Sequence, residues 1–284
     1  MDTVRRIPEL RAAVAGARRA GRPIGVAPTM GALHAGHDAL IEAARRDGCF
    51  TVVTIFVNPT QFAPHEDFDR YPRDEPADLR RCAAAGADLV FLPALADMYR
   101  PDAVTTVRVA KLADHLCGPF RPGHFDGVAT IVAKLFLLVQ PDRAYFGEKD
   151  AQQLAIIRRM TRDLDFPIEI VGCPTVREPD GLAMSSRNRY LSAADRARAA
   201  ALHRALCAGR DAVAAGEQAA DGVIAIMTGV LHAADVRDID YASVVDPETI
   251  QNVDVICAPV LLAIAARVGA ARLIDNMRAT PPRA

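Results

Sequence analysis

Two histidines, three residues apart, lie in a glycine-containing segment that follows a short apolar run. The segment reads Pro28-Thr29-Met30-Gly31-Ala32-Leu33-His34-Ala35-Gly36-His37, after the apolar residues 24–27. Residues three apart on a helix share one face, so both imidazoles can point into the same small volume. Glycine lets a backbone approach a ligand closely, and the first N–H groups of a helix attract phosphate. We interpret the segment as a nucleotide site whose imidazoles stabilise charge at a phosphorus; zinc is the alternative, although no third ligand lies nearby in the sequence.

Two further segments carry groups that suit a phosphate. Met184-Ser185-Ser186-Arg187 supplies hydroxyls and a guanidinium in a loop, and an ordinary exposed polar loop is the alternative. Gly147-Glu148-Lys149-Asp150 contains one of the few lysines, since lysine occurs only at 111, 134 and 149. A compact ammonium suits a phosphate contact, although Asp150 could simply cap the helix that follows.

Side-chain amides form a second kind of candidate site. Asn58-Pro59-Thr60-Gln61-Phe62 follows another apolar run, and Gln153 opens a helical pattern. A neutral amide can hold an organic acid without quenching its carboxylate as a nucleophile. We therefore expect Gln61 and Gln153 to face one substrate, while Asn58-Pro59 also fits a plain turn. The segment 118–125 resembles a flap whose Arg121 and His124 close on substrates, and ordinary turn chemistry is the alternative.

Short apolar runs alternate with helical patterns over the first 175 or so residues. Strands are predicted at 24–27, 51–57, 89–92, 144–146 and 168–172, with helices at 38–47, 75–85, 128–139 and 151–164. This alternation predicts an α/β fold with a Rossmann-like doubly wound parallel sheet. Ligands bind beyond the carboxyl ends of the strands in such sheets, which is where these motifs fall.

The pattern changes after residue 176. A helix is predicted to begin at Ser192, with Asp195 in its first turn, and another covers 219–233. The runs 241–245, 261–265 and 272–274 are typical of hairpin-connected strands. We therefore expect a nucleotide- and substrate-binding domain at 1–176 and a smaller C-terminal α+β lid domain at 177–284.

Composition excludes several classes of protein. The chain has 284 residues and a formal net charge of −1, which argues against a general nucleic-acid or membrane-surface binder. The longest apolar run, 255–266, is too short to span a membrane. Six cysteines form no CxxC pair, so neither a zinc site nor a disulfide framework is indicated. We expect Cys173 and Cys257 to be small core residues of a cytoplasmic protein that has no signal peptide.

Together, these motifs resemble the pantothenate synthetase (pantoate–β-alanine ligase) family. The His-x-x-His turn alone would indicate only the nucleotidylyltransferase and class I aminoacyl-tRNA synthetase superfamily. The Asn-Pro-Thr-Gln-Phe block, and Gly-Glu-Lys-Asp with its paired glutamines, narrow the resemblance to the ligase. It covers nearly the whole chain in order, through segments 28–37, 56–62, 121–128, 144–154, 174–190, 246–248 and 272–276.

The resemblance implies a two-step reaction in pantothenate (vitamin B5) and coenzyme A biosynthesis. The pantoate carboxylate attacks the α-phosphorus of ATP, giving pantoyl adenylate and pyrophosphate. β-Alanine then attacks the acyl carbon, releasing AMP and pantothenate. The family uses Mg²⁺ with ATP and is usually a homodimer formed through its nucleotide-binding domain.

The resemblance also assigns residues. Catalytic roles fall to His37, His34 and Lys149, and pantoate and β-alanine contacts to Gln61, Gln153 and Asn58. The ATP-binding set is Met30, Gly31, Ala32, Leu33, His34, Ala35, Gly36, His37, Gly147, Glu148, Lys149, Asp150, Val176, Met184, Ser185, Ser186 and Arg187. Ala35, Asp38, Ala63 and His65 depart from commoner family residues without removing a group assigned to chemistry.

Two other functions remain open at this point. A nucleotidyltransferase that leaves a nucleotide on a phosphate ester would share His34 and His37 but would not need Gln61 and Gln153. A non-catalytic nucleotide sensor would bind ATP without pyrophosphate exchange. A tRNA synthetase is disfavoured, because the chain is short and has no basic RNA-binding module.

Overall fold

The computed structural model describes residues 1–64 and 66–282, so His65 lies outside it. These residues group into two compact units. The first unit comprises Met1–Val109, Arg121–Glu148 and Ile156–Pro174, and the second comprises Ala110–Phe120, Lys149–Ala155 and the chain from Thr175 onward. The first two of these segments, together with Thr175 and Val176, thus join the second unit although the sequence assigned them to 1–176. Side-chain hydrogen bonds account for this, because Gln152 binds the backbone of residues 112–117 and Asn276 binds Lys149 O.

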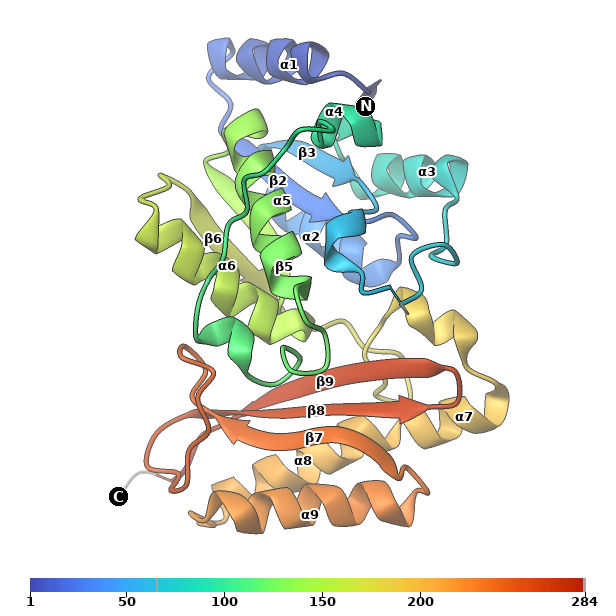
Figure 1. Cartoon of the computed structure of the whole chain (residues 1–284), viewed down its shortest axis with the longest axis vertical. Coiled ribbons are helices and arrows are strands. Elements are labelled where there is room, and N and C mark those ends of the chain that lie inside the picture. The colour runs from blue at the N-terminus through green and yellow to red at the C-terminus, as the bar shows by residue number, and fades with distance from the viewer. Residues whose placement is uncertain (65, 283–284) are drawn as a thin grey trace. The chain divides into compact units, whose positions relative to one another are not determined.

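The first unit contains a six-stranded sheet in which every neighbouring pair is parallel (Figure 1). In spatial order its strands are β1 (Asp2–Val4), β4 (Leu89–Phe91), β3 (Phe50–Ile55), β2 (Ile24–Thr29), β5 (Arg143–Gly147) and β6 (Glu169–Cys173). The central strands are buried on both faces, as parallel sheets require. The predicted fold class is confirmed, although the sequence analysis missed β1, which is too short to give a pattern.

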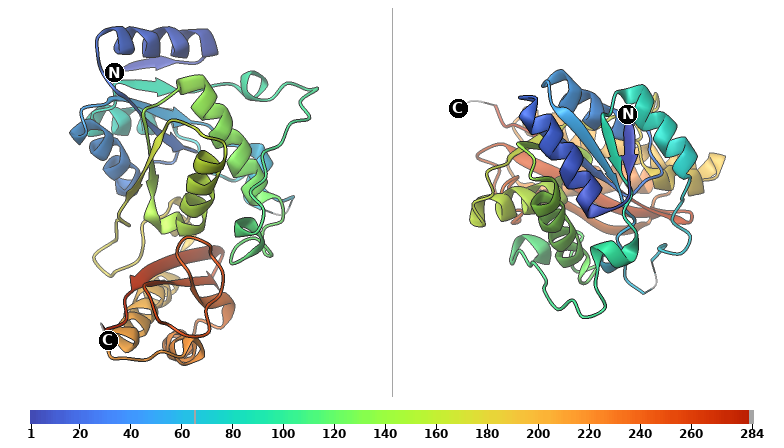
Figure 2. Two further views of the ribbon diagram at one scale, coloured as in Figure 1. Left: turned by 90° about the vertical axis from the view of Figure 1, so that its left-hand side faces the viewer. Right: turned by 90° about the horizontal axis from the view of Figure 1, so that it is seen from above.

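Helices cover both faces of this sheet. They are α1 (Ile7–Arg19), α2 (Ala35–Arg46), α3 (Glu75–Ala85), α5 (His124–Val139) and α6 (Ala151–Asp163), with a short α4 (Leu95–Met98). Helices α2 and α3 pack together, while α5 packs against α1 and lies beside α6 (Figures 1 and 2). Helix α1 is a further element that the sequence analysis did not predict.

The strand order reverses between β2 and β5. From β2 the chain proceeds to β3 and β4 on one side, and from β5 to β6 on the other. The two strands are hydrogen-bonded neighbours, with Val26 opposite Ala144. Crevices for ligands open outside the carboxyl ends of such strands. The histidine segment leaves β2 at this edge, and the Gly-Glu-Lys-Asp segment leaves β5 there.

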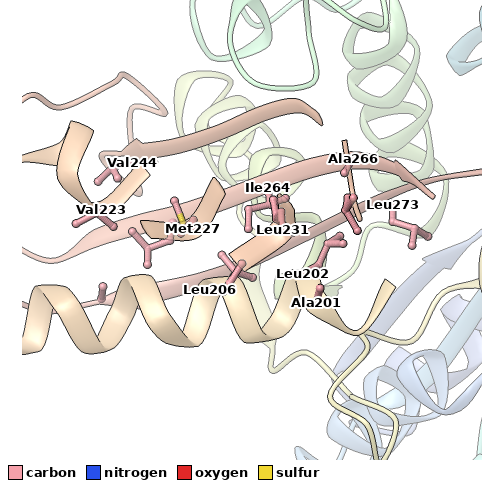
Figure 3. Packing of buried hydrophobic residues seen from close by; sticks show 14 of the residues in the cluster. Ala201, Leu202, Leu206, Val223, Met227, Leu231, Val244, Ile264, Ala266 and Leu273 are labelled. Atoms are coloured by element: carbon pink, nitrogen blue, oxygen red, sulfur yellow. The ribbon is translucent and has the colours of Figure 1, made fainter. Parts of the chain in front are cut away.

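The second unit contains an antiparallel sheet in the order β7-β8-β9 (Figure 1). Its elements are α7 (Ala193–Ala199), α8 (Ala201–Ala214), α9 (Ala220–Ala233), β7 (Asp238–Val245), β8 (Val260–Val268) and β9 (Ala271–Ala279). Figure 3 shows its core, in which Leu206 and Met227 of the helices pack with Ile264 of the sheet. The predicted start of a helix at Ser192 is confirmed, because Ser192 Oγ accepts a hydrogen bond from Asp195 N.

The helices of the structure bear on the expectation that the chain does not span a membrane. Within residues 1–64 and 66–282, no helix combines the length and apolar character needed to cross a membrane.

The expectation that Cys257 lies in the core is wrong. Cys257 is exposed, because β8 begins at Val260 and residue 257 lies in the loop before it. Cys173 is buried, as predicted.

Candidate active site

The backbone after β2 is fixed by a carboxylate from α3. Asp78, only 4% exposed, accepts hydrogen bonds from Ala32 N at 3.0 Å and Leu33 N at 2.8 Å. Gly31 and Ala32 have φ of +79° and +51°, a conformation that favours glycine. A Cβ at Gly31 would also lie 2.8 Å from Asp78 Oδ2. The turn that presents the two histidines is therefore fixed by hydrogen bonds to one buried side chain, that of Asp78.

His34 and His37 lie together at the start of α2. Their ring centroids are 4.2 Å apart. His34 Nδ1 accepts a hydrogen bond from Gly36 N at 3.1 Å, and His37 Nδ1 accepts one from His34 N at 3.2 Å. A neutral imidazole that accepts at Nδ1 carries its hydrogen on Nε2. Both rings are thereby set as Nε2–H donors, the form that suits phosphate oxygens.

Gln61 and Asn58 form a buried amide pair after β3. Asn58 Nδ2 donates to Gln61 Oε1 at 3.1 Å and to Gly127 O at 3.2 Å. Gln61 Nε2 donates to Met30 Sδ at 3.0 Å, which joins this turn to the histidine segment. Asn58 is 1% exposed, and its Oδ1 also accepts from Tyr99 OH at 2.8 Å. Asn58 therefore holds Gln61 in place.

Arg121 and His124 point inward, toward the backbone of Gln61. His124 is 9% exposed, and its Nδ1 lies 2.8 Å from Gln61 O, so this nitrogen carries the donated hydrogen. Arg121 Nη1 donates to His124 Nε2 at 2.9 Å. In the structure these side chains therefore support the backbone of Gln61, and their closure on substrates stays a prediction.

Glu66 completes this network. Its carboxylate accepts from Arg121 Nε at 2.6 Å and from Arg121 Nη2 at 2.7 Å. Burial by itself would raise the pKa of Glu66, but the hydrogen bonds and positive charge of Arg121 outweigh it and hold the pKa below its ordinary value. A bidentate pair of this kind fixes the guanidinium in one orientation.

The Lys149 segment belongs to the second unit. Lys149 lies in a short 3₁₀ turn at Glu148–Asp150, and its Nζ is 3.6 Å from Asp150 Oδ1. Gln152 is buried and donates to Leu112 O and His115 O, so its amide is used within the protein. Gln153 is half-buried. Of the paired glutamines, Gln153 is therefore the one suited to a ligand.

The loop that carries Met184–Arg187 continues from a small hairpin at residues 176–184. Residues Arg177 and Ala183 form an antiparallel bridge, and Met184 N donates to Val176 O at 3.0 Å. Ser185 Oγ accepts from Arg187 N and caps the 3₁₀ turn Ser186–Tyr190. Met184, Ser185, Ser186 and Arg187 are each half-buried. Val176 and the segment Met184–Arg187 thus lie together at one end of the same hairpin.

No group of three or more His, Cys, Asp or Glu side chains that could hold a metal occurs in the described part of the chain. The two histidines are instead oriented by backbone N–H groups at Nδ1. This arrangement suits hydrogen bonding to a ligand.

The sequence that carries these motifs matches a known family over almost its full length. The family model for pantoate-beta-alanine ligase matches residues 2–278. The chain belongs to the pantoate-beta-alanine ligase family. Pantothenate synthetase from Moorella thermoacetica is 51% identical over 277 residues, which cover 98% of each chain.

Solved structures of this ligase family share the fold. Pantothenate synthetase from Thermus thermophilus superposes with a TM-score of 0.93 at 48% identity, covering 99% of this chain and 100% of the other. Pantoate-beta-alanine ligase from Francisella tularensis, complexed with beta-gamma ATP and beta-alanine, has a TM-score of 0.80 at 31% identity. That match covers 98% of this chain and 97% of the other.

The sequence analysis missed the buried carboxylates that bind and orient the segments of the candidate site. Asp78 and Glu66 lie in ordinary polar stretches, and only the fold brings them to residues 32–33 and 121. The sequence did point to one other supporting segment, Arg272–Asn276, whose Asn276 binds Lys149 O. That segment contributed to the family resemblance, but the sequence analysis gave it no role.

Proposed function

We propose that this chain condenses pantoate with β-alanine at the expense of ATP, through a pantoyl adenylate. The observation that carries the proposal is the oriented imidazole pair where the strand order reverses. His34 and His37 leave β2 as Nε2–H donors beside the strand that leads to Lys149. Placed donors of this type stabilise the charge that develops on a phosphoryl group during substitution.

In the first step, a carboxylate oxygen of pantoate bonds to the α-phosphorus of ATP. The bond from that phosphorus to the bridging oxygen breaks, and pyrophosphate leaves with its electrons. His34, His37 and Lys149 would stabilise the added charge on the phosphate oxygens. The backbone of Met30–His37, with Gly147–Asp150, Val176 and Met184–Arg187, would hold the nucleotide.

In the second step, the β-alanine amine bonds to the acyl carbon and AMP leaves as the carbon–oxygen bond breaks, while the nitrogen releases a proton to solvent. A bound amine at attack distance needs little further catalysis. Gln61 and Gln153 would hold the pantoate, with the contact from Gln61 Nε2 to the weakly accepting Met30 thioether giving way to the substrate. Gln61 would also lie where β-alanine enters. Asn58 serves this step by fixing Gln61, since both ends of its own amide bind protein groups.

Mg²⁺ would enter with ATP. Mg²⁺ usually keeps several waters and binds through substrate phosphates and one or two carboxylates, so no protein cage is needed. Asp150, with its side chain 46% exposed beside Lys149, is a carboxylate that fits this requirement. The ion would draw charge away from the phosphate oxygens.

We further infer a cytoplasmic homodimer formed through the first unit, with no nucleic-acid or membrane partner. Support for the compartment comes from the cysteines, all six of which are free. The dimer rests on the family resemblance. Sedimentation equilibrium of the purified protein tests it.

ATP–pyrophosphate exchange tests the function. We expect exchange of labelled pyrophosphate into ATP only when pantoate is present, and pantothenate formation once β-alanine is added. Exchange that requires a phosphate ester instead would identify a nucleotidyltransferase. ATP binding without exchange under any acid would identify a nucleotide sensor.

A further inference from the structure

Strand β9 carries one partner of an ion pair, buried Asp275, which reaches half-buried Arg177 at the base of the hairpin that bears Met184–Arg187. Asp275, 3% exposed, accepts hydrogen bonds from Arg177 Nη1 at 2.7 Å and Nη2 at 3.0 Å. Arg177 Nη1 also donates to Gly181 O at 3.0 Å, across the tip of the same hairpin. Arg177 directly follows Val176, so this pair fixes the backbone that leads into Met184–Arg187.

The next residue of β9 holds the other phosphate-binding segment. Asn276 Nδ2 donates to Lys149 O at 2.8 Å. Successive side chains of a strand point to opposite faces, so Asp275 and Asn276 reach two different neighbours of the same strand. Asn276 N also donates to Asp275 Oδ1 at 2.8 Å, which links the two contacts directly.

We propose that Asp275 and Asn276 are positioning residues that set the spacing between Lys149 and the Met184–Arg187 loop. The inference rests on the proposed function, in which both segments hold ATP. A buried ion pair adds little net stability compared with apolar residues of similar size. The Arg177–Asp275 pair is therefore better explained by the fixed geometry that it gives to the loop. The ATP affinity of the protein depends on that geometry.

The first test is Asn276→Ala, with Asn252→Ala as its control because Asn252 is exposed in the same unit. ATP affinity is measured by titration calorimetry of the full chain, together with the thermal midpoint and the KM for pantoate at saturating ATP. Loss of the hydrogen bond to Lys149 O, which joins two neutral groups, predicts an ATP Kd raised about three- to tenfold. The pantoate KM and the midpoint should stay near the wild-type values, and Asn252→Ala should change nothing.

A second variant, Asp275→Asn, keeps the shape of the side chain and removes its charge. It should raise the ATP Kd in the same way, with the pantoate KM again little changed. An unaltered ATP Kd in either folded variant would overturn the inference, as would a parallel rise of the ATP Kd and pantoate KM.

These outcomes separate the inference from the proposed function. A wild type that binds ATP but lacks pantoate-dependent exchange contradicts the proposed function, and a raised ATP Kd in Asn276→Ala still supports the positioning role. A wild type that shows the exchange, with an unaltered ATP Kd in Asn276→Ala, contradicts the positioning role alone.

Discussion

Leu33 N donates a hydrogen bond of 2.8 Å to Asp78 Oδ1, and thereby joins the histidine segment to α3. Asp78→Ala would leave this N–H and that of Ala32 buried without a partner. Each unsatisfied group costs about 1–3 kcal/mol, so the two together should lower the unfolding free energy by about 2–6 kcal/mol. Urea denaturation measures it.

Two further variants define the origin of that loss. Asp78→Asn retains one acceptor oxygen and should lose less stability than Asp78→Ala. Asp221→Ala, at an exposed position on α9, should stay within about 0.5 kcal/mol of the wild type. If Asp78→Ala proves as stable as Asp221→Ala, the carboxylate does not hold the turn.

Gly127 of α5 leaves no room for a side chain against the amide-bearing turn. A Cβ there would lie 2.4 Å from Thr60 O and 2.8 Å from Gln61 N. Gly127→Ala should therefore displace Gln61, raise the pantoate KM at least tenfold and destabilise the protein by about 1–3 kcal/mol. Steady-state exchange kinetics and thermal unfolding measure both effects.

The control for Gly127→Ala is Gly229→Ala in α9, where a Cβ would contact nothing within 4 Å. Alanine favours a helix over glycine by about 1 kcal/mol, so this variant should be as stable as the wild type or more so. Equal pantoate KM values for the two variants would contradict the role given to Gly127.

The fold could be predicted because its signals are local. Buried parallel strands such as β2 and β3 appear as short apolar runs, and the helix start at Ser192 follows from one capping side chain. The segments that carry His34 and Lys149 could likewise be predicted, because each directly follows a strand.

The contacts that hold those segments could not be predicted. Asp78 lies 45 residues after Leu33 in the chain, and Asn276 lies 127 residues after Lys149. Nothing in the local pattern distinguishes such polar residues from exposed ones. The contacts of Arg121 and His124 could not be predicted for the same reason, since their partners Gln61 and Glu66 become neighbours only in the fold.

The Glu66–Arg121 pair should make stability sensitive to acid. Arg121 holds the pKa of Glu66 below its ordinary value of 4.5, so the charged carboxylate stabilises the fold above that pH. We expect Glu66→Gln to cost about 1–2 kcal/mol at pH 7. The difference should vanish as the pH falls through the lowered pKa, because wild-type Glu66 is then neutral too. Denaturation at a series of pH values measures this; a difference that does not shrink as the pH falls below 4.5 would contradict it.

Cysteine reactivity should follow burial. Burial raises the pKa of Cys82 to about 12 and that of Cys173 to about 11, so few thiolates exist at pH 8. We expect iodoacetamide to modify exposed Cys257 at least a hundredfold faster than these two in the native protein. Peptide mass spectrometry over time measures the rates. Unfolding in urea should remove the difference, and early labelling of Cys82 without denaturant would contradict the buried assignment.

The two half-reactions should respond differently to loss of the phosphate-binding groups. A placed donor to the developing charge contributes about 10²- to 10³-fold in rate, so His34→Ala and Lys149→Ala should slow pyrophosphate exchange by about that factor. Reaction of preformed pantoyl adenylate with β-alanine should slow far less, since proximity of the amine accounts for most of that step. Single-turnover measurements of each half-reaction decide this. Equal losses in both would show that His34 and Lys149 do not act on the phosphorus.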